Sequence, residues 1–193
     1  MARRLGSIVP FARSRADQPV RLFTQDESRF GLHLPRYRRL TNKGVKPRQP
    51  FEPLYEYYWL YGAVEPASGE NFFLELPHLN SDCFTVFLAQ LSRHYHDSLN
   101  IMLIDGAPAH IAKAVEVPEN IILIRLPSYS PELNPVERLW LDIKRRIDVY
   151  DPNIRSSLPA LQDHVAGILR GYSNEYIASL TGYDYIVNAA IVL

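Results

Sequence analysis

The chain has 193 residues, a mass of 22.2 kDa and no net formal charge at pH 7. Its hydrophobic fraction of 47% and charged fraction of 22% are those of an ordinary soluble globular protein, and the length suits one domain with a proper core. The single cysteine, Cys83, excludes an internal disulfide framework and fits a reducing cytoplasm. We expect no membrane partner, because no apolar run approaches the roughly 18 residues of a membrane span. A signal peptide is also not expected, since Pro10 and Arg13 interrupt the short apolar stretch near the start.

Basic residues are concentrated near the N-terminus, although the whole chain is neutral. Seven Lys and Arg residues and no acidic residue lie from Arg29 to Arg48, among them Arg36, Arg38 and Arg39. Such a segment can bind a polyanion, or it can be a solvated basic loop. The charge pattern alone leaves both interpretations open.

The first part of the chain predicts an arm, a strand and a loop. Residues 1–19 lack a sustained apolar period and indicate a basic flexible arm. Residues 20–24 form a short strand that delivers the acidic pair Asp26 and Glu27 at its C-terminal end. Four prolines among basic residues predict an irregular loop or hairpin over 35–53.

The middle of the chain predicts a hairpin followed by a helix. Residues 55–65 and 71–76 are rich in aromatic and β-branched side chains and are joined by a turn at Gly69. A helix over 82–96 follows, capped by Asn80 or Ser81.

Two apolar strands and three helices complete the expected α/β domain. Residues 100–104 and 121–126 are nearly all apolar, as strands buried on both faces are. Asp105 ends the first of them, and a helix follows from Gly106 to about Val115. Helices are also expected over 135–148 and 158–170, and an apolar C-terminus is expected to dock on the body. The helix over 135–148 carries one apolar stripe, formed by Val136, Leu139, Trp140, Ile143 and Ile147. A hairpin followed by alternating helices and strands indicates a mixed sheet flanked by helices.

Three acidic residues are candidates for a metal site. Asp26 and Asp105 follow predicted strands, and sites in α/β sheets gather at the carboxyl ends of strands. Glu137 lies one position off the apolar stripe of its helix, where it can point into a cleft. Three such carboxylates can hold two Mg²⁺ ions, which stabilise both oxygens of an in-line phosphoryl displacement. From spacing alone, these residues could equally be helix caps and surface acids.

The sequence segments around these three acids resemble the motifs of a known family. Asp26 lies in FTQDESRFG, Asp105 in LIDGAPAH and Glu137 in LPSYSPELNPVERLW. Taken in this order, the three segments are similar to the Asp-Asp-Glu (DDE) motif in the catalytic domain of insertion-sequence transposases of the Tc/mariner superfamily. The resemblance covers residues 20–148 approximately.

The resemblance implies a ribonuclease-H-like fold over 20–150, with a helical extension over 151–193 packing on the same domain. It implies catalysis by Asp26, Asp105 and Glu137 with Mg²⁺ or Mn²⁺. The implied reaction is cleavage of DNA followed by attack of a 3′-hydroxyl on target DNA. The implied partners are transposon ends and target DNA, with a homodimer assembled on DNA. The implied location is the cytoplasm, at the nucleoid if the source is bacterial.

The chain departs from the family in two ways. Only 31 residues separate Asp105 from Glu137, somewhat fewer than in many relatives. Full-length members also carry an N-terminal helix-turn-helix region that binds the transposon ends, whereas about 19 residues precede the first predicted strand here. We therefore expect a fragment or a split-frame product, acting with a separately encoded helix-turn-helix partner. The alternative is a truncated, catalytically inactive remnant that only binds DNA non-specifically.

Several neighbouring residues have two interpretations each. His110 either supports Asp105 or contacts DNA, or it packs in the core. Asn134 precedes Pro135 and caps the next helix or assists catalysis. Arg138 tracks phosphates or solvates its helix. Glu27 points away from Asp26 on a strand and is not expected to be a ligand.

Two further kinds of site are disfavoured. A nucleotide-binding enzyme would need a GxGxxG or GxxxxGK[ST] motif, and neither occurs. A zinc site at Cys83, His94 and His96 is also poor, since no CxxC exists and two histidines two positions apart on a helix diverge.

Overall fold

The fold is described from a computed structural model. The residues described are 10, 17–32, 43–44, 55–112, 114–127, 133–148, 151–154 and 156–191. The strands are β1 (Val20–Gly31), β2 (Tyr57–Val64), β3 (Asn71–Leu76), β4 (Leu99–Ile104) and β5 (Ile121–Arg125). The helices are α2 (Ser81–His94), α3 (Pro108–Ile111), α4 (Val136–Arg146), α5 (Leu158–Arg170), α6 (Asn174–Thr181) and α7 (Asp184–Ile191). None of the helices in these ranges combines the length and the apolar character needed to cross a membrane.

The strands form one mixed sheet in the order β3-β2-β1-β4-β5. β1 pairs with β2 antiparallel and with β4 parallel, and β5 pairs with β4 parallel. The expected hairpin is β2 with β3, also antiparallel. A mixed sheet flanked by helices was the fold class expected from the sequence, and it is confirmed.

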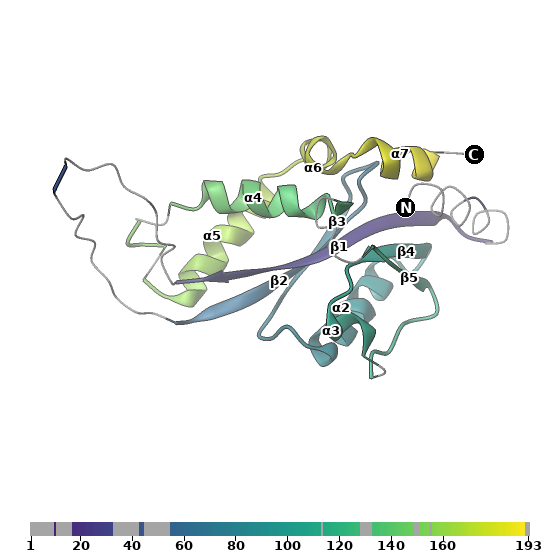
Figure 1. The fold of residues 1–193 in the computed structure, drawn as a ribbon, viewed down its shortest axis with the longest axis horizontal. Helices are drawn as coiled ribbons and strands as arrows, with labels where there is room; N and C mark the ends of the chain where they lie inside the picture. Colours follow the sequence, from purple (N-terminus) through teal and green to yellow (C-terminus); the bar gives the residue numbers. More distant parts are fainter. Residues whose placement is uncertain are drawn as a thin grey trace.

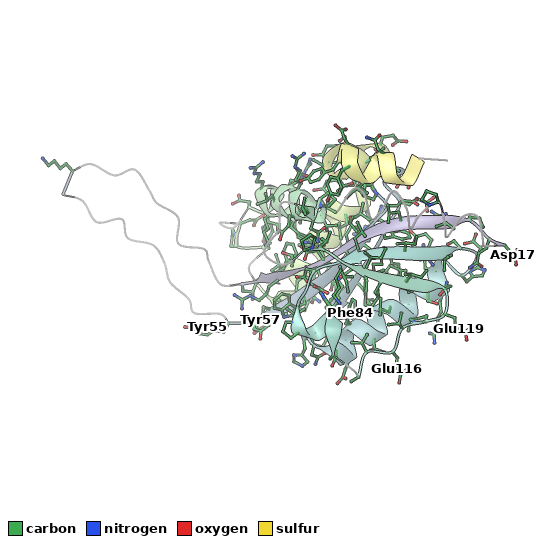
Figure 2. All side chains as sticks on the ribbon, turned by 45° about the vertical axis from the view of Figure 1, so that its right-hand side comes forward. Asp17, Tyr55, Tyr57, Phe84, Glu116 and Glu119 are labelled. Carbon is green, nitrogen blue, oxygen red and sulfur yellow. The ribbon has the colours of Figure 1, made fainter. Side chains whose placement is uncertain are left out.

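Helices cover both faces of the sheet (Figure 1). α4, α5, α6 and α7 lie on one face, whereas α2 and α3 lie on the other. Because neighbouring residues of a strand point to opposite faces, β1 contributes to both cores: Leu22 packs beneath Ile186 of α7, and Phe23 packs beneath α2. Figure 2 places Phe84 of α2 in the interior, where its side chain is fully buried. Each face of the sheet therefore has an apolar core of its own.

β1 is longer than the sequence predicted, and this moves the acidic pair. The strand runs to Gly31, so Asp26 and Glu27 lie in its middle and not at its C-terminal end. The extension exists because β2 pairs with β1 from Thr24 to Gly31, after the pairing with β4 has ended at Thr24. Thr24 is opposite Leu103 of β4, so extending that register by two residues sets Asp26 beside Asp105.

Local signals explain the helices that match their predictions. Asn80 caps α2 by accepting a hydrogen bond from the Cys83 N–H at 2.9 Å. In α4, four residues of the apolar stripe are buried, and Ile147 packs partly buried against them. α5 begins with Ser157 as its N-cap and a proline in its first turn, and its bounds are those expected.

Two elements differ from their predictions. α3 is a single turn that ends at Ile111, whereas a helix to about Val115 was expected; Ala107 offers it no side-chain cap, and Ala112 is extended. β5 was expected to be buried on both faces, but Ile122 is 38% exposed. β5 is an edge strand whose single described partner is β4, so its apolar run reflects partial burial only.

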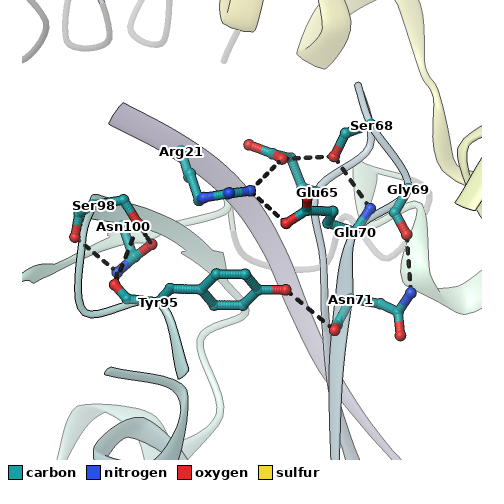
Figure 3. A network of polar contacts seen from close by, with 9 residues as sticks. All are labelled: Arg21, Glu65, Ser68, Gly69, Glu70, Asn71, Tyr95, Ser98 and Asn100. Atoms are coloured by element: carbon teal, nitrogen blue, oxygen red, sulfur yellow. Dashed lines mark hydrogen bonds and ion pairs between the residues drawn. The ribbon is translucent and has the colours of Figure 1, made fainter. Parts of the chain in front are cut away.

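A polar network fixes the end of the sheet where β1 begins (Figure 3). Arg21 contacts Glu65 at 3.1 Å and Glu70 at 2.6 Å, which ties β1 to the turn between β2 and β3. Gly69 in that turn has a φ of +76°, and a Cβ there would lie 1.8 Å from the Asn174 carbonyl oxygen of α6. Glycine is therefore required where the turn and α6 meet.

Most of the predicted arm and all but two residues of the proline-rich loop over 35–53 fall outside the described ranges. The same holds for Arg36, Arg38 and Arg39. Beyond residue 150, Leu161 and Val165 of α5 and Ile177 of α6 belong to the core beneath α4.

Candidate active site

Asp26 is held on the face of the sheet that α4 covers. Its carboxylate is 9% exposed, and its Oδ2 accepts a hydrogen bond from the Trp140 Nε1–H at 2.9 Å. The indole fits because Gly62, the β2 residue opposite Asp26, leaves space for it. A Cβ on Gly62 would lie 2.6 Å from the Trp140 ring. A glycine inside a strand thus allows the close approach that orients Asp26.

The environment of Asp26 strongly disfavours its charged form. Burial, followed by the negative charges of Glu137 and Glu27, raises the pKa of Asp26 to about 8. The hydrogen bond from Trp140 opposes this shift without cancelling it. A carboxylate in this position is stabilised in its charged form only when positive charge is placed beside it.

Asp105 follows the last residue of β4 and is held differently. Its Oδ1 accepts two hydrogen bonds, from the Ala107 N–H at 2.8 Å and from His110 Nδ1 at 2.7 Å. The hydrogen bond from His110 is the main reason that the pKa of Asp105 is lowered. This carboxylate is therefore stabilised in its charged form by groups of the protein itself.

His110 lies between two carboxylates. Its Nδ1 bonds to Asp105, and its Nε2 bonds to Glu27 Oε1 at 2.8 Å. The ring packs against Phe84 of α2 with centroids 4.4 Å apart, and its side chain has no exposed surface. Burial alone would lower the pKa of His110, but the hydrogen bonds with Asp105 and Glu27 raise it to about 9.

Glu137 lies in the first turn of α4 and is exposed. Asn134 fixes the start of this helix. Its side-chain Nδ2 donates to the Gln25 carbonyl of β1 at 2.9 Å, and its Oδ1 accepts from the Val136 N–H at 3.3 Å. Pro135 is the N-cap residue of α4 and has no side chain that can cap it, so Asn134 supplies this hydrogen bond from one residue earlier, and the same side chain sets α4 against the strand that carries Asp26.

The remaining predicted site residues are placed as follows. Arg138 follows Glu137, is exposed, and lies 4.5 Å from the centre of the Tyr183 ring. Asp142, which lies on the same helix as Glu137, is engaged elsewhere by Arg146 at 2.7 Å and by the Tyr172 hydroxyl at 2.6 Å. The positions of Asp26, Asp105 and Glu137 around one cation stay a prediction.

Sequence reasoning missed two side-chain contacts around these acids. Trp140 was taken as core, although a buried indole N–H needs an acceptor, and that need was the available signal. Glu27 was expected to be no ligand, and its contact with His110 went unforeseen. The two residues are 83 positions apart, so no local pattern could join them.

The described residues contain no group of three His, Cys, Asp or Glu side chains that already could hold a metal ion. In donor type, however, Asp26, Asp105 and Glu137 fit a divalent cation, because carboxylate oxygens are what Mg²⁺ and Mn²⁺ take. The raised pKa of Asp26 fits as well, since a cation would stabilise its charged form. The residues therefore fit such an ion in chemistry and in charge.

A family model and a known protein are similar to this chain in sequence. Residues 21–156 match the family model described as DDE superfamily endonuclease. A protein of Sinorhizobium fredii (strain NBRC 101917 / NGR234), called uncharacterized protein y4pE/y4sA, is 37% identical over 83 residues. That match covers 42% of this chain and 62% of the relative.

Solved structures support the same fold. The Mos1 strand transfer complex matches with a TM-score of 0.63 and 16% identity, covering 100% of this chain and 61% of the Mos1 chain. The Mos1 mariner paired-end complex with Mn matches with a TM-score of 0.63 and 18% identity, covering 98% and 61%. This chain thus spans about three fifths of these proteins and shares their ribonuclease-H-like fold. With the family model matching most of its length, the chain belongs to the DDE superfamily endonucleases.

Proposed function

We propose that this chain is the catalytic domain of a Tc/mariner-type DNA transposase. It cleaves DNA strands, and the freed 3′-hydroxyl then attacks a phosphodiester of the target DNA, from which the 3′-oxygen of the target strand leaves. One observation carries the proposal: the charge of Glu137 on α4 raises the pKa of Asp26, and continuing the register of β1 with β4 by two residues sets Asp26 beside Asp105. Membership of the DDE endonuclease family and the transposition complexes of Mos1 support it.

Asp26, Asp105 and Glu137 are the catalytic residues of this proposal and would hold Mg²⁺ or Mn²⁺, with two ions as the expected number. The Mos1 mariner paired-end complex with Mn supports a divalent ion. When bound, such ions neutralise charge on the attacking and leaving oxygens of a phosphodiester.

The protein's own groups prepare these acids. Trp140 holds the Asp26 carboxylate by a single hydrogen bond, and Ala107 and His110 hold Asp105. Asn134 sets the beginning of α4 against β1, which keeps Glu137 near Asp26. Because both aspartates are held in place before DNA binds, little reorganisation of them is needed when the reaction begins.

DNA is the proposed partner, both as transposon ends and as target. Arg138, exposed beside Glu137, would contact a phosphate, and Arg36, Arg38 and Arg39 would add further phosphate contacts. We also propose a homodimer on DNA, a separately encoded helix-turn-helix partner, and action in the cytoplasm, at the nucleoid if the source is bacterial.

The test is nicking of supercoiled plasmid by the purified chain in Mn²⁺. Wild type should nick slowly and not at all in EDTA. Asp26→Asn, Asp105→Asn and Glu137→Gln should each lower the rate by about 100-fold or more, since each removes a carboxylate charge that would hold the divalent cations. Asp142→Asn, on the same helix as Glu137 but bonded elsewhere, is the control and should nick like wild type.

Equal nicking by wild type and all three variants would mean that the site is wrong or that the nuclease is a contaminant. Salt-dependent DNA binding without nicking, in Mn²⁺ as well as in Mg²⁺, would point to the inactive remnant that only binds DNA.

A further inference from the structure

The two neighbouring acids of β1 point to opposite faces of the sheet. Asp26 faces α4 and bonds to Trp140, whereas Glu27 faces α3 and bonds to His110. Glu27 has a side chain that is 5% exposed, so it is a buried acid outside the proposed metal-binding set. A buried carboxylate needs a hydrogen-bond partner. The partner of Glu27 is His110, which is also hydrogen-bonded to Asp105, the second aspartate of the proposed site.

Both ring nitrogens of His110 are hydrogen-bonded to carboxylates. Nδ1 lies 2.7 Å from Asp105 Oδ1, and Nε2 lies 2.8 Å from Glu27 Oε1. The ring therefore bridges the two acidic side chains. Phe84 packs on its face and no part of the side chain is exposed, so the ring cannot rotate out of this position.

Glu27 is itself held in place. The Gln25 side chain, two residues earlier on the same face of β1, donates from Nε2 to Glu27 Oε1 at 2.7 Å. The oxygen that accepts from His110 thus accepts from Gln25 as well. A rigid strand therefore fixes one end of the chain of hydrogen bonds.

At the other end, the same arrangement fixes the rotation of Asp105. Both of its hydrogen bonds fall on Oδ1, one from the backbone of Ala107 and one from His110. Its side chain remains 48% exposed. Oδ2 is therefore the oxygen that remains to meet a ligand from solvent.

We propose that Glu27 and His110 are positioning residues, which fix the Asp105 carboxylate so that its Oδ2 faces the divalent cation. The inference rests on the proposed function. In this arrangement the two acids of β1 have different roles. Asp26 would bind the cation itself, and Glu27 acts on Asp105 through His110. Partners of this kind typically contribute about 10-fold to 100-fold in metal affinity or activity.

The first test measures Mn²⁺ affinity from the electron paramagnetic resonance signal of free Mn²⁺. Glu27→Gln keeps the shape and removes the charge, and it should weaken Mn²⁺ binding by on the order of 10-fold. His110→Gln should do the same, and the double variant should lose no more than either single one. In plasmid nicking, kcat should fall while the Kd for DNA stays as in wild type.

The matched control is Glu75→Gln. Glu75 is also a strand glutamate in a side-chain hydrogen bond, from Gln162 at 2.6 Å, but on β3. Its substitution should leave Mn²⁺ affinity unchanged. Wild-type Mn²⁺ affinity in Glu27→Gln, or losses that multiply in the double variant, would overturn the proposal. If His110→Gln does not fold, the isosteric Glu27→Gln decides alone.

A second test needs no metal and separates this inference from the proposed function. Glu27 and Asp105 are coupled only through His110 in this proposal, so their effects on the melting temperature in EDTA should not be additive. Glu27→Gln, Asp105→Asn and the double variant form the cycle. Additive shifts would refute the coupling. A wild type that neither binds Mn²⁺ nor nicks DNA would refute the proposed function, while the cycle would still decide whether Glu27 acts on Asp105.

Discussion

Asp26 and Asp105 belong to neighbouring parallel strands, yet their carboxylates are held in opposite ways. Asp26 is buried against the α4 side with one neutral donor, Trp140, and its pKa is raised to about 8. Asp105 is half exposed, is bonded to the His110 imidazolium and the Ala107 backbone, and has a lowered pKa. Asp105 has a positively charged hydrogen-bond partner, whereas the hydrogen bond to Asp26 comes from a neutral donor; the charge of Lys144 on α4 acts on Asp26 without offsetting its burial. The comparison suggests that an added cation matters most to Asp26.

The largest expected effect is on stability as a function of pH. Asp26 has a pKa of about 8 when folded and an ordinary value of 3.8 when unfolded, so between these pH values the folded state binds a proton that the unfolded state does not. The unfolding free energy of the metal-free protein should therefore fall as pH rises from about 4 to about 8, by up to about 1.4 kcal/mol per pH unit.

His110 adds a second, separable contribution. Its pKa is raised to about 9 from 6.5, so its stabilising contribution is complete below about 6.5 and is lost as pH rises through 9. In Asp26→Asn, the decline between pH 4 and 6.5 should disappear, and only the decline above 6.5 should remain. Urea unfolding in EDTA across this pH range measures both. An unchanged slope below pH 6.5 in Asp26→Asn would contradict the assignment.

At a fixed pH of 7.5, Asp26→Asn should raise the melting temperature of the metal-free protein. The amide requires neither the uptake of a proton on folding nor the burial of a charge, and it still accepts from Trp140. A gain on the order of 2 kcal/mol corresponds to about 4–8 °C for a chain of this size. Mg²⁺ should stabilise wild type by mass action and stabilise Asp26→Asn much less. Thermal melts with EDTA and with millimolar Mg²⁺ provide the measurement.

Asp105→Asn should change the melting temperature in the opposite direction. It removes one of the two charged partners of the buried His110 imidazolium, and a buried charge that loses a partner is destabilising. Because Asp105 is half exposed, we expect a loss of about 1 kcal/mol, or about 2–4 °C. Crowding of the three acids would by itself predict a gain for every neutralised acid. A rise in melting temperature for Asp105→Asn would therefore erase the contrast between the two aspartates.

The sequence predicted those parts of the site that depend on local patterns. The apolar period placed α4 and left Glu137 just off its buried stripe, and Asn134 before Pro135 indicated the cap. The length of β1 was missed, because it depends on pairing with β2 and not on the residues of β1. The edge position of β5 was likewise a property of the whole sheet.

The contacts between distant residues could not be predicted in the same way. Trp140 reaches Asp26 across 114 positions, and the contact requires Gly62 on a third element. His110 reaches Glu27 only because the parallel pairing of β4 with β1 brings α3 against that strand. Side-chain alternation did predict that Glu27 points away from Asp26. Alternation could not predict that Glu27 is hydrogen-bonded to His110 on that side of the sheet.

The smallest expected effect concerns where DNA lies relative to the two sides of the sheet. Arg138 is exposed on α4, next to Glu137, whereas Arg93 is exposed in the last turn of α2 on the opposite side. Each phosphate that an arginine neutralises releases counterions, so losing one contact lowers the slope of log affinity against log salt by about one. Arg138→Gln should therefore flatten the slope by about one, and the matched control Arg93→Gln should leave it unchanged. The Arg138 guanidinium lies 4.5 Å from the centre of the Tyr183 ring, so the substitution could also affect folding. The melting temperature of the Arg138→Gln variant is therefore measured as well, to exclude a loss of folded protein. Binding is followed by fluorescence anisotropy with a labelled duplex between 50 and about 200 mM salt, a range over which such contacts weaken affinity strongly. Equal slopes in the two variants would mean that DNA does not run along α4, and a flatter slope in Arg93→Gln alone would move it to the side of α2.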